Sequence, residues 1–312
     1  MLQTISWWCS GTIGRAWDWS YRPLVGVYVL IAVLGGTYAW ALRRHAAATG
    51  GEHVPSTRHY ALRFGAGLAL LAVSSDWPLG PLGAGYLASV GALRMLIFTF
   101  GVAPLLLSGT PPWLLRRLLR IDPDPLAAPG RMLRAARATT LPWVAFLQFN
   151  LLLVVTQLPV VVDALKVTQA GSFTLDMAWL VASIVMWVPL MRPLPELPGL
   201  GDPARLLYLF GLSVLPTVPA SFLTFSRFPL YELYELAPRV FSSLDAVVDQ
   251  QMAGLGLKII GGLIIWGIMT VLFFRWANGE QPDKVQTVTW SQFERDLDRY
   301  DLRQRKTPPP PS

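Results

Sequence analysis

The sequence predicts an all-α membrane protein, a seven-transmembrane-helix bundle with its N-terminus outside and its C-terminus in the cytoplasm. One observation is a set of seven apolar segments, each near the ~20 residues that a helix needs to cross ~30 Å of hydrocarbon. The other is that most of the 26 Lys and Arg residues fall in alternate connections, which is typical of cytoplasmic loops. The segments are residues 23–42, 60–79, 85–107, 141–162, 174–191, 204–225 and 250–274.

Three parts follow from this pattern: an outer N-terminal segment at 1–22, the seven-helix membrane domain at 23–275 and a cytoplasmic tail at 276–312. The N-terminal segment lacks the positive start and the continuous apolar stretch of a cleavable signal peptide. We therefore expect the first apolar segment to direct insertion. In the tail, Ser291 with Glu294 three residues later is the pattern of a reciprocal helix cap. It predicts one short amphipathic helix before a disordered, proline-rich end.

The inner connections between the first four segments are basic. Pro111 and Pro112 end the third segment, because proline removes backbone donors. The connection that follows, at 110–140, is the longest inner one and is predicted to contain a short helix. This helix is either a solvated element that sets the topology or one that binds lipid phosphate, so membrane lipid is an expected partner. Its cations are Arg131, Arg134 and Arg137.

The connection at 226–249 is the longest outer one and precedes the last segment. Long ordered loops are disproportionately functional. We therefore predict that this connection and the start of the last helix bind a partner, and packing over the outer mouth of the bundle is an equal alternative. The candidate partner-binding residues are Tyr231, Tyr234, Asp249, Gln250 and Gln251.

Composition and motifs exclude several function classes. The net charge of +7 is explained by the topology, so no nucleic-acid partner is expected. Gly254, Gly256 and Gly261 lie in an apolar helix rather than in a strand-to-helix turn, which argues against nucleotide binding. The sequence contains no phosphate-binding lysine loop, zinc-protease helix motif or serine elbow. We therefore expect that the protein is not an enzyme.

Histidine and cysteine positions constrain metal and haem binding. The three histidines, His45, His53 and His59, all fall in the first inner connection. This placement excludes a bis-histidine haem within the bundle and predicts solvated side chains. The single cysteine, Cys9, excludes an intrachain disulfide and a cysteine-pair metal site.

The polar residues that we expect inside the bilayer, where they are costly, are Arg94, Asn150, Gln157, Asp176 and Lys258. A charge at mid-membrane costs at least ~2.5 kcal/mol, so each should face the bundle interior or water. Asp176 is the expected counter-ion of Arg94 or of Lys258. One interpretation is that these residues pair to define the helix register. The other is a polar cavity that opens outward.

If there is a polar cavity, methionines near these residues could bind a metal ion in it. The thioethers of Met95, Met177 and Met252 are soft ligands that suit Cu(I). Met95 and Met177 together with Asp176 form the candidate metal site. Methionine at such positions is more often ordinary packing, so the expected Cu(I) binding is weak.

Three stretches of the chain are similar to a known family. Residues 103–111 read Ala-Pro-Leu-Leu-Leu-Ser-Gly-Thr-Pro, residues 229–234 contain Pro-Leu-Tyr and a second Tyr three positions on, and residues 249–254 read Asp-Gln-Gln-Met-Ala-Gly. They resemble motifs of the CtaG-type cytochrome c oxidase assembly factors, seven-helix proteins linked to copper loading of haem-copper oxidases. The resemblance runs from about residue 60 to about residue 275.

The resemblance implies a fold, a location and a partner, but not the family's metal site. The family's intramembrane histidines align with Gly91, Met95, Gln157, Ser172 and Asp176 of this chain, so no candidate imidazole is present. We expect a multi-pass protein of the bacterial inner membrane with cytochrome c oxidase subunits as partners. Two functions stay open: a factor that assists copper insertion or stabilises a subunit on the outer side, or a permanent, non-catalytic accessory subunit.

Overall fold

The computed structural model describes residues 6–11, 14–48, 56–122 and 128–279, and these residues form helices joined by short connections, with no strand among them. By packing, residues 1–269 form one compact unit and residues 270–312 a second. Of the second unit, the described part is the end of the last helix. The predicted tail helix, the proline-rich end and His53 lie outside the described residues.

Each expected apolar segment coincides with a helix or a run of helices. The first three are α1 (Val25–Ala48), α2 (Ser56–Ser75), and the run of α4 (Ala88–Leu96), η1 (Ile97–Val102) and α5 (Ala103–Gly109). The next three are α8 (Pro142–Thr156) with α9 (Pro159–Leu165), α10 (Gln169–Met191), and α11 (Asp202–Val214) with α12 (Thr217–Phe225). The last is α14 (Ala246–Gly279).

Within the described chain, five helical stretches are long and apolar enough to cross a membrane, and six if the bent pair of α7 and α8 counts as one span. Helix α2 does not reach that apolarity, because Arg58, His59 and Arg63 occupy its first two turns. Its crossing of the membrane stays a prediction, as does the sidedness of the two termini.

The prediction of one continuous helix at 141–162 is wrong, because this segment forms two helices. Helix α8 ends at Thr156, and α9 starts at Pro159. Proline has no N–H to donate and disfavours helical backbone at the residue before it, Leu158, which is extended. Gln157 is therefore the C-cap of α8 rather than a mid-helix residue.

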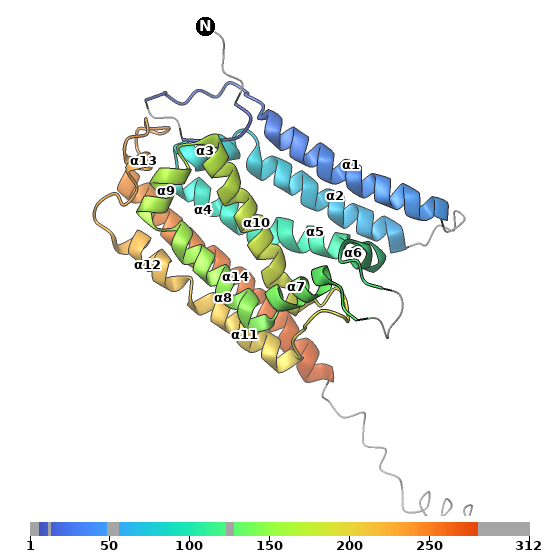
Figure 1. Cartoon of the computed structure of the whole chain (residues 1–312). Coiled ribbons are helices and arrows are strands. Elements are labelled where there is room, and N and C mark those ends of the chain that lie inside the picture. The colour runs from blue at the N-terminus through green and yellow to red at the C-terminus, as the bar shows by residue number, and fades with distance from the viewer. Residues whose placement is uncertain (1–5, 12–13, 49–55, 123–127, 280–312) are drawn as a thin grey trace, which may run out of the picture. The chain divides into compact units, whose positions relative to one another are not determined.

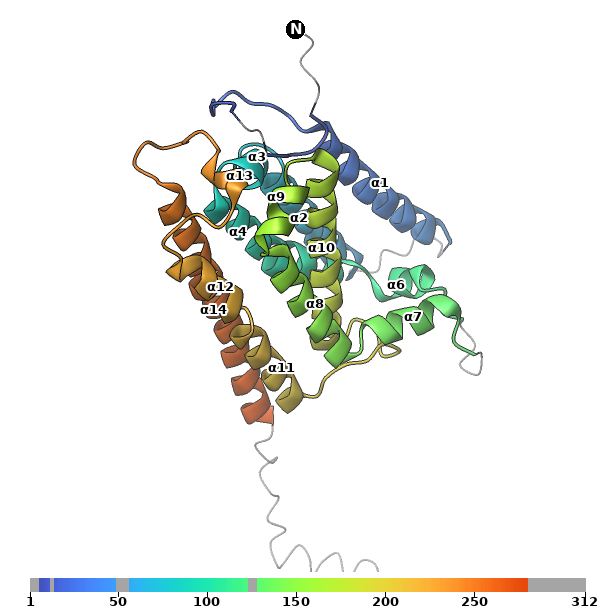
Figure 2. The same cartoon turned by 60° about the vertical axis from the view of Figure 1, so that its left-hand side comes forward.

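Short helices gather at the two ends of the 1–269 unit (Figures 1 and 2). At one end lie α3 (Leu79–Gly85), α9, α13 (Glu232–Glu235) and the described N-terminal residues, and at the other lie α6 (Pro112–Leu118) and α7 (Arg131–Thr139). In α7, Leu133 is buried while Arg131 and Arg134 are exposed, and Arg137 Nε donates to the backbone oxygen of Glu196 at 2.9 Å. The exposed pair can still meet lipid phosphate, whereas Arg137 is held by the protein.

Helix η1 has a π-helical turn where Pro104 cannot donate a backbone hydrogen bond. The wider turn leaves the carbonyl of Thr99 able to accept from Trp187 Nε1 of α10 at 2.6 Å. The hydroxyls of Thr99 and Ser183 lie 3.2 Å apart in the same layer. The third apolar segment is therefore joined to the fifth through the carbonyl and the hydroxyl of Thr99.

Close packing of α2 on α5 leads to a first prediction. A Cβ at Gly109 would lie 2.7 Å from Phe64 Cα, inside any normal contact, whereas a Cβ at Gly65 on α2 would meet nothing within 4 Å. We expect Gly109→Ala to lower stability by about 1–3 kcal/mol through overpacking. Thermal unfolding in detergent measures the effect, with Gly65→Ala as the matched control. Equal unfolding midpoints for the two variants would contradict this packing.

Candidate functional site

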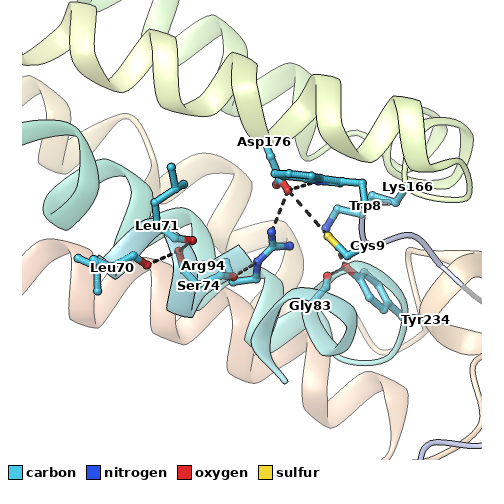
Figure 3. A network of polar contacts seen from close by, with 10 residues as sticks. All are labelled: Trp8, Cys9, Leu70, Leu71, Ser74, Gly83, Arg94, Lys166, Asp176 and Tyr234. Atoms are coloured by element: carbon cyan, nitrogen blue, oxygen red, sulfur yellow. Dashed lines mark hydrogen bonds and ion pairs between the residues drawn. The ribbon is translucent and has the colours of Figure 1, made fainter. Parts of the chain in front are cut away.

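The buried ion pair between Arg94 of α4 and Asp176 of α10 lies at the centre of the polar interior (Figure 3). Arg94 Nη2 is 2.8 Å from Asp176 Oδ2, and their side chains are 5% and 15% exposed. Arg94 Nε also donates to the Ser74 backbone oxygen at the end of α2, at 2.7 Å. Helices α2, α4 and α10 are thus joined through one guanidinium. Of the two expected partners for Asp176, the structure selects Arg94.

The N-terminal residues before α1 cover this ion pair. Trp8 Nε1 donates to Asp176 Oδ2 at 2.9 Å, and the amide of Trp7 donates to Gln169 Oε1 at 3.0 Å. Trp8 is fully buried and meets Phe173 edge to face. The N-terminal segment is therefore part of the packed interior, and its apolar Trp-Trp-Cys run was the sequence signal for it.

Cys9 belongs to the same N-terminal residues that cover the ion pair, and its Sγ lies 4.0 Å from Asp176 Oδ2. Burial raises the pKa of the Cys9 thiol to about 11, against the opposing field of Arg94. Because the thiolate is the reactive species, the thiol is protonated and unreactive at neutral pH.

The single cysteine makes this pKa directly measurable. Since the folded-state pKa is raised, we expect maleimide labelling of the native protein to be slow at pH 7 and to accelerate about tenfold per pH unit toward pH 10. After unfolding, labelling at pH 7 should be fast. Rapid native labelling at pH 7 with no dependence on pH would show that Cys9 is not buried as described.

Lys166, at the C-cap of α9, forms a second polar group with Tyr234 of α13. Lys166 Nζ donates to Tyr234 OH at 2.8 Å, and Tyr234 OH donates to the Gly83 backbone oxygen at 2.7 Å. Burial, with the nearby Arg94 adding to it, lowers the pKa of Lys166 to about 8. Burial likewise raises the pKa of the Tyr234 hydroxyl, so it stays a neutral donor.

Tyr231 lies beside this group and contacts the end of α8. Its hydroxyl donates to Gln157 Oε1 at 3.0 Å, while Gln157 Nε2 lies 3.4 Å from Met95 Sδ. Tyr231 and Tyr234 are both buried and pack edge to face. Asp163 of α9, which the sequence did not single out, accepts from the backbone N–H of Leu233 at 3.1 Å and so caps α13.

These groups line one cavity between α4, α8, α9, α10, α13 and α14. The space open to water centres is ≈ 50 Å³, and one water needs about 10–15 Å³ by that measure. The cavity therefore has room for a small cluster of waters. Its polar lining is Arg94, Thr156, Gln157, Lys166, Asp176, Tyr231 and Tyr234.

The Asp-Gln-Gln stretch secures α14 beside this cavity. Asp249 Oδ2 accepts from the Ala88 backbone N–H at 2.6 Å, and Oδ1 accepts from the amide and hydroxyl of Ser89, so Asp249 caps α4 from another helix. Gln250 Oε1 accepts from the Leu230 N–H at 2.7 Å, and Gln251 Nε2 donates to the Ser226 oxygen at 3.1 Å. The stretch therefore ties α4 and the 226–249 connection to α14.

Comparison with protein families matches residues 36–279 to the Caa3_CtaG family, described as cytochrome c oxidase caa3 assembly factor. The chain belongs to this family. With its several long apolar helices, this Caa3_CtaG member is a multi-pass membrane protein. Comparisons with curated proteins and with solved structures find no match.

The positions expected for the family's histidines converge in this Caa3_CtaG member. Gly91, Met95, Gln157 and Asp176 all line the cavity, and Ser172 hydrogen bonds the side chain of Cys9 beside it. Helices far apart in sequence bring them together.

The candidate metal ligands do not form one site. Met95 lines the cavity, whereas Met177 packs against the cluster of Trp8, Cys9 and Val27. The carboxylate of Asp176 already accepts from Arg94 and Trp8. Among the described residues, no group of three or more His, Cys, Asp or Glu could hold a metal ion. These residues do not fit a resident copper ion, so weak Cu(I) binding stays a prediction that requires rearrangement.

The predicted partner-binding residues lie mostly inside the protein. Tyr231, Tyr234, Asp249 and Gln250 are buried, and Gln251 is half-buried. These residues cannot form an exposed docking surface unless the connection opens. Of the alternatives for this connection, their burial favours packing over the end of the bundle, and partner binding by them stays a prediction.

The remaining intramembrane polar residues are apart from the ion pair. Asn150 is buried, and its Nδ2 donates to the Phe146 oxygen at 2.8 Å while its Oδ1 has no partner among the described residues. Lys258 is exposed on α14 and donates to the Thr217 hydroxyl of α12. His45, expected to be solvated, stacks on Trp113 with ring centroids 3.9 Å apart.

Lys166, Trp8 and Cys9 are cavity or cover residues that reasoning from sequence missed. Lys166 lies in the connection between the fourth and fifth apolar segments, and its sequence neighbourhood has no motif. Its place beside Tyr234 depends on the turn between α9 and α10, where the Gly11 N–H also donates to the Lys166 backbone oxygen at 2.7 Å.

Proposed function

We propose that this protein assists the assembly of a cytochrome c oxidase in the bacterial inner membrane by stabilising an oxidase membrane subunit, in a non-catalytic role. Family membership supports the assembly role. The observation that favours subunit stabilisation over copper delivery is the content of the cavity. Where imidazoles would be needed, it contains a buried Arg94–Asp176 ion pair and Lys166.

Electrostatics oppose copper in this cavity. Two cationic side chains and one carboxylate line it, so an entering Cu(I) ion meets net positive charge in a low-dielectric setting, where such repulsion is strong. The one thioether in the lining, Met95 Sδ, is engaged by Gln157. Copper would have to break existing hydrogen bonds to bind there.

Contact with the oxidase subunit is supported by the outward side of the 226–249 connection. Its tyrosines point inward, but Phe228, Leu236 and Phe241 are 64%, 52% and 47% exposed. Exposed aromatic and aliphatic side chains of this size are typical anchors at interfaces. We therefore place the contact with the subunit on these three residues rather than on Tyr231 and Tyr234.

The proposal is tested by deleting the gene and complementing the deletion strain. One complementing gene encodes the wild type, and the other encodes the double variant Phe228→Ser, Phe241→Ser. We expect the deletion strain to contain much less assembled oxidase, while the oxidase that remains has normal copper per haem. The double variant should be present in the membrane at the wild-type level but restore little oxidase. Normal oxidase amount with low copper would instead indicate copper insertion, and an unaffected oxidase would overturn an assembly role.

A permanent accessory subunit is the second candidate, favoured by the same loss of histidines from a retained scaffold. The two functions differ in stoichiometry. A subunit co-purifies with the finished oxidase in constant ratio, whereas an assembly factor is substoichiometric and leaves the mature enzyme. Quantifying the protein in purified active oxidase distinguishes them.

A further inference from the structure

The cavity has more positive than negative charge among its lining residues. Arg94 and Lys166 supply two cations, and Asp176 supplies the one carboxylate in the lining. An uncompensated charge away from water is costly, and buried charges are normally paired. One further negative charge would balance the site.

Several donors in this lining are unused. Arg94 employs Nε for the Ser74 oxygen and Nη2 for Asp176, and its Nη1 has no hydrogen-bond partner in the part of the chain that the structure describes. Lys166 Nζ has three hydrogens and donates one of them to Tyr234 OH. Two ammonium hydrogens and Arg94 Nη1 therefore remain for a molecule in the cavity.

The size and polarity of the cavity restrict that molecule. Space for a small cluster of waters accommodates an anion of two to four heavy atoms and excludes a lipid headgroup or a nucleotide. Ala88, Ala92, Leu175 and Leu223 form apolar walls, which suit a short hydrocarbon group. Lys166 is half-buried rather than fully buried, so the cavity is not sealed from solvent at this residue.

The chemistry of the donors favours a carboxylate over a spherical anion. A carboxylate has two oxygens, so one can accept from Arg94 Nη1 while the other accepts from Lys166 Nζ, and both hydrogen bonds are charge-assisted. A bound anion would also offset the burial that lowers the pKa of Lys166.

We propose that the cavity between Arg94 and Lys166 is a binding site for a small carboxylate of the size of formate or acetate. The anion accepts from Arg94 Nη1 and Lys166 Nζ, and any methyl group faces the alanine and leucine wall. The site is separate from the exposed contact surface at Phe228, Leu236 and Phe241. Its presence therefore does not depend on how the protein contacts an oxidase subunit.

The test uses the full chain purified in detergent. Equilibrium dialysis against radiolabelled acetate at constant ionic strength, with chloride as the balancing anion, should show saturable binding of one acetate per chain. Lys166→Met should weaken binding by about tenfold or more, the effect of losing one charge-assisted hydrogen bond. Lys258→Met, which removes an exposed lysine outside the cavity, should bind as the wild type does.

Two results would contradict the proposed carboxylate site. One is the absence of saturable acetate binding by the wild-type protein, which would leave the cavity to water. The other is equal binding by wild type and Lys166→Met. Because the wild-type measurement needs no variant, the first result stands even if Lys166→Met fails to fold.

Discussion

Asp176→Ala is expected to destabilise the protein more than any other substitution that we propose, by about 3–5 kcal/mol, because it leaves the buried guanidinium of Arg94 without its counter-ion. The side chains of the pair are only 5% and 15% exposed, so the few waters that the cavity can hold cannot replace a full counter-charge. Trp8 Nε1 loses its acceptor as well. The measurements are the midpoint of thermal unfolding in detergent and the amount of protein in the membrane.

Two companion variants separate the ion pair from a general loss of charge. Asp202→Ala removes the acid of the exposed Arg205–Asp202 pair and should cost only about 0–1 kcal/mol. Combining Arg94→Met with Asp176→Leu removes both charges and should recover much of the stability lost in Asp176→Ala. If Asp176→Ala behaves like Asp202→Ala, the buried pair does not hold the helices together.

Asp249→Ala is expected to have the second largest effect, about 2–4 kcal/mol, because the buried Ala88 amide loses its acceptor at about 1–3 kcal/mol and the partly buried Ser89 amide loses a weaker one. Ala88 and Ser89 begin α4, and the residue before them, Leu87, has no side chain that can cap the helix. The cap comes from α14, 160 positions away in sequence for Ser89. Thermal unfolding and membrane abundance again give the measurement.

Neighbouring substitutions provide the comparison for this cap. Asp249→Asn keeps one acceptor oxygen and should fall between wild type and Asp249→Ala. Gln251→Ala removes a single hydrogen bond to the Ser226 oxygen and should cost about 0.5–1.5 kcal/mol. An Asp249→Ala protein as stable as Gln251→Ala would mean that α4 does not depend on α14 for its first turn.

Helix positions were predictable because hydrophobic length is a local property. The segment expected at 174–191 lies within α10, and the one expected at 250–274 lies within α14. The break at Pro159 was missed, although proline and the residue before it were visible signals. The resemblance to the family was predictable as well, because its motifs are contiguous in sequence.

The candidate site was only partly predictable. The free-energy cost of a charge in the membrane predicted that Arg94 needs a partner, and the same reasoning allowed Asp176 to pair with Arg94 or with Lys258. The inward direction of Tyr231 and Tyr234 was not predictable, because a loop has no period from which a buried face can be inferred. Lys166 was missed for the same reason.

By itself, the sequence determined that this is an all-α membrane protein of the cytochrome c oxidase assembly family without intramembrane histidines, since apolar length and contiguous motifs are local features. Only the tertiary structure decided that Arg94 pairs with Asp176, that Asp249 caps α4 and that Lys166 and Tyr234 meet in one cavity. These contacts join residues far apart in sequence, and their distances depend on how helices pack rather than on where each helix begins and ends.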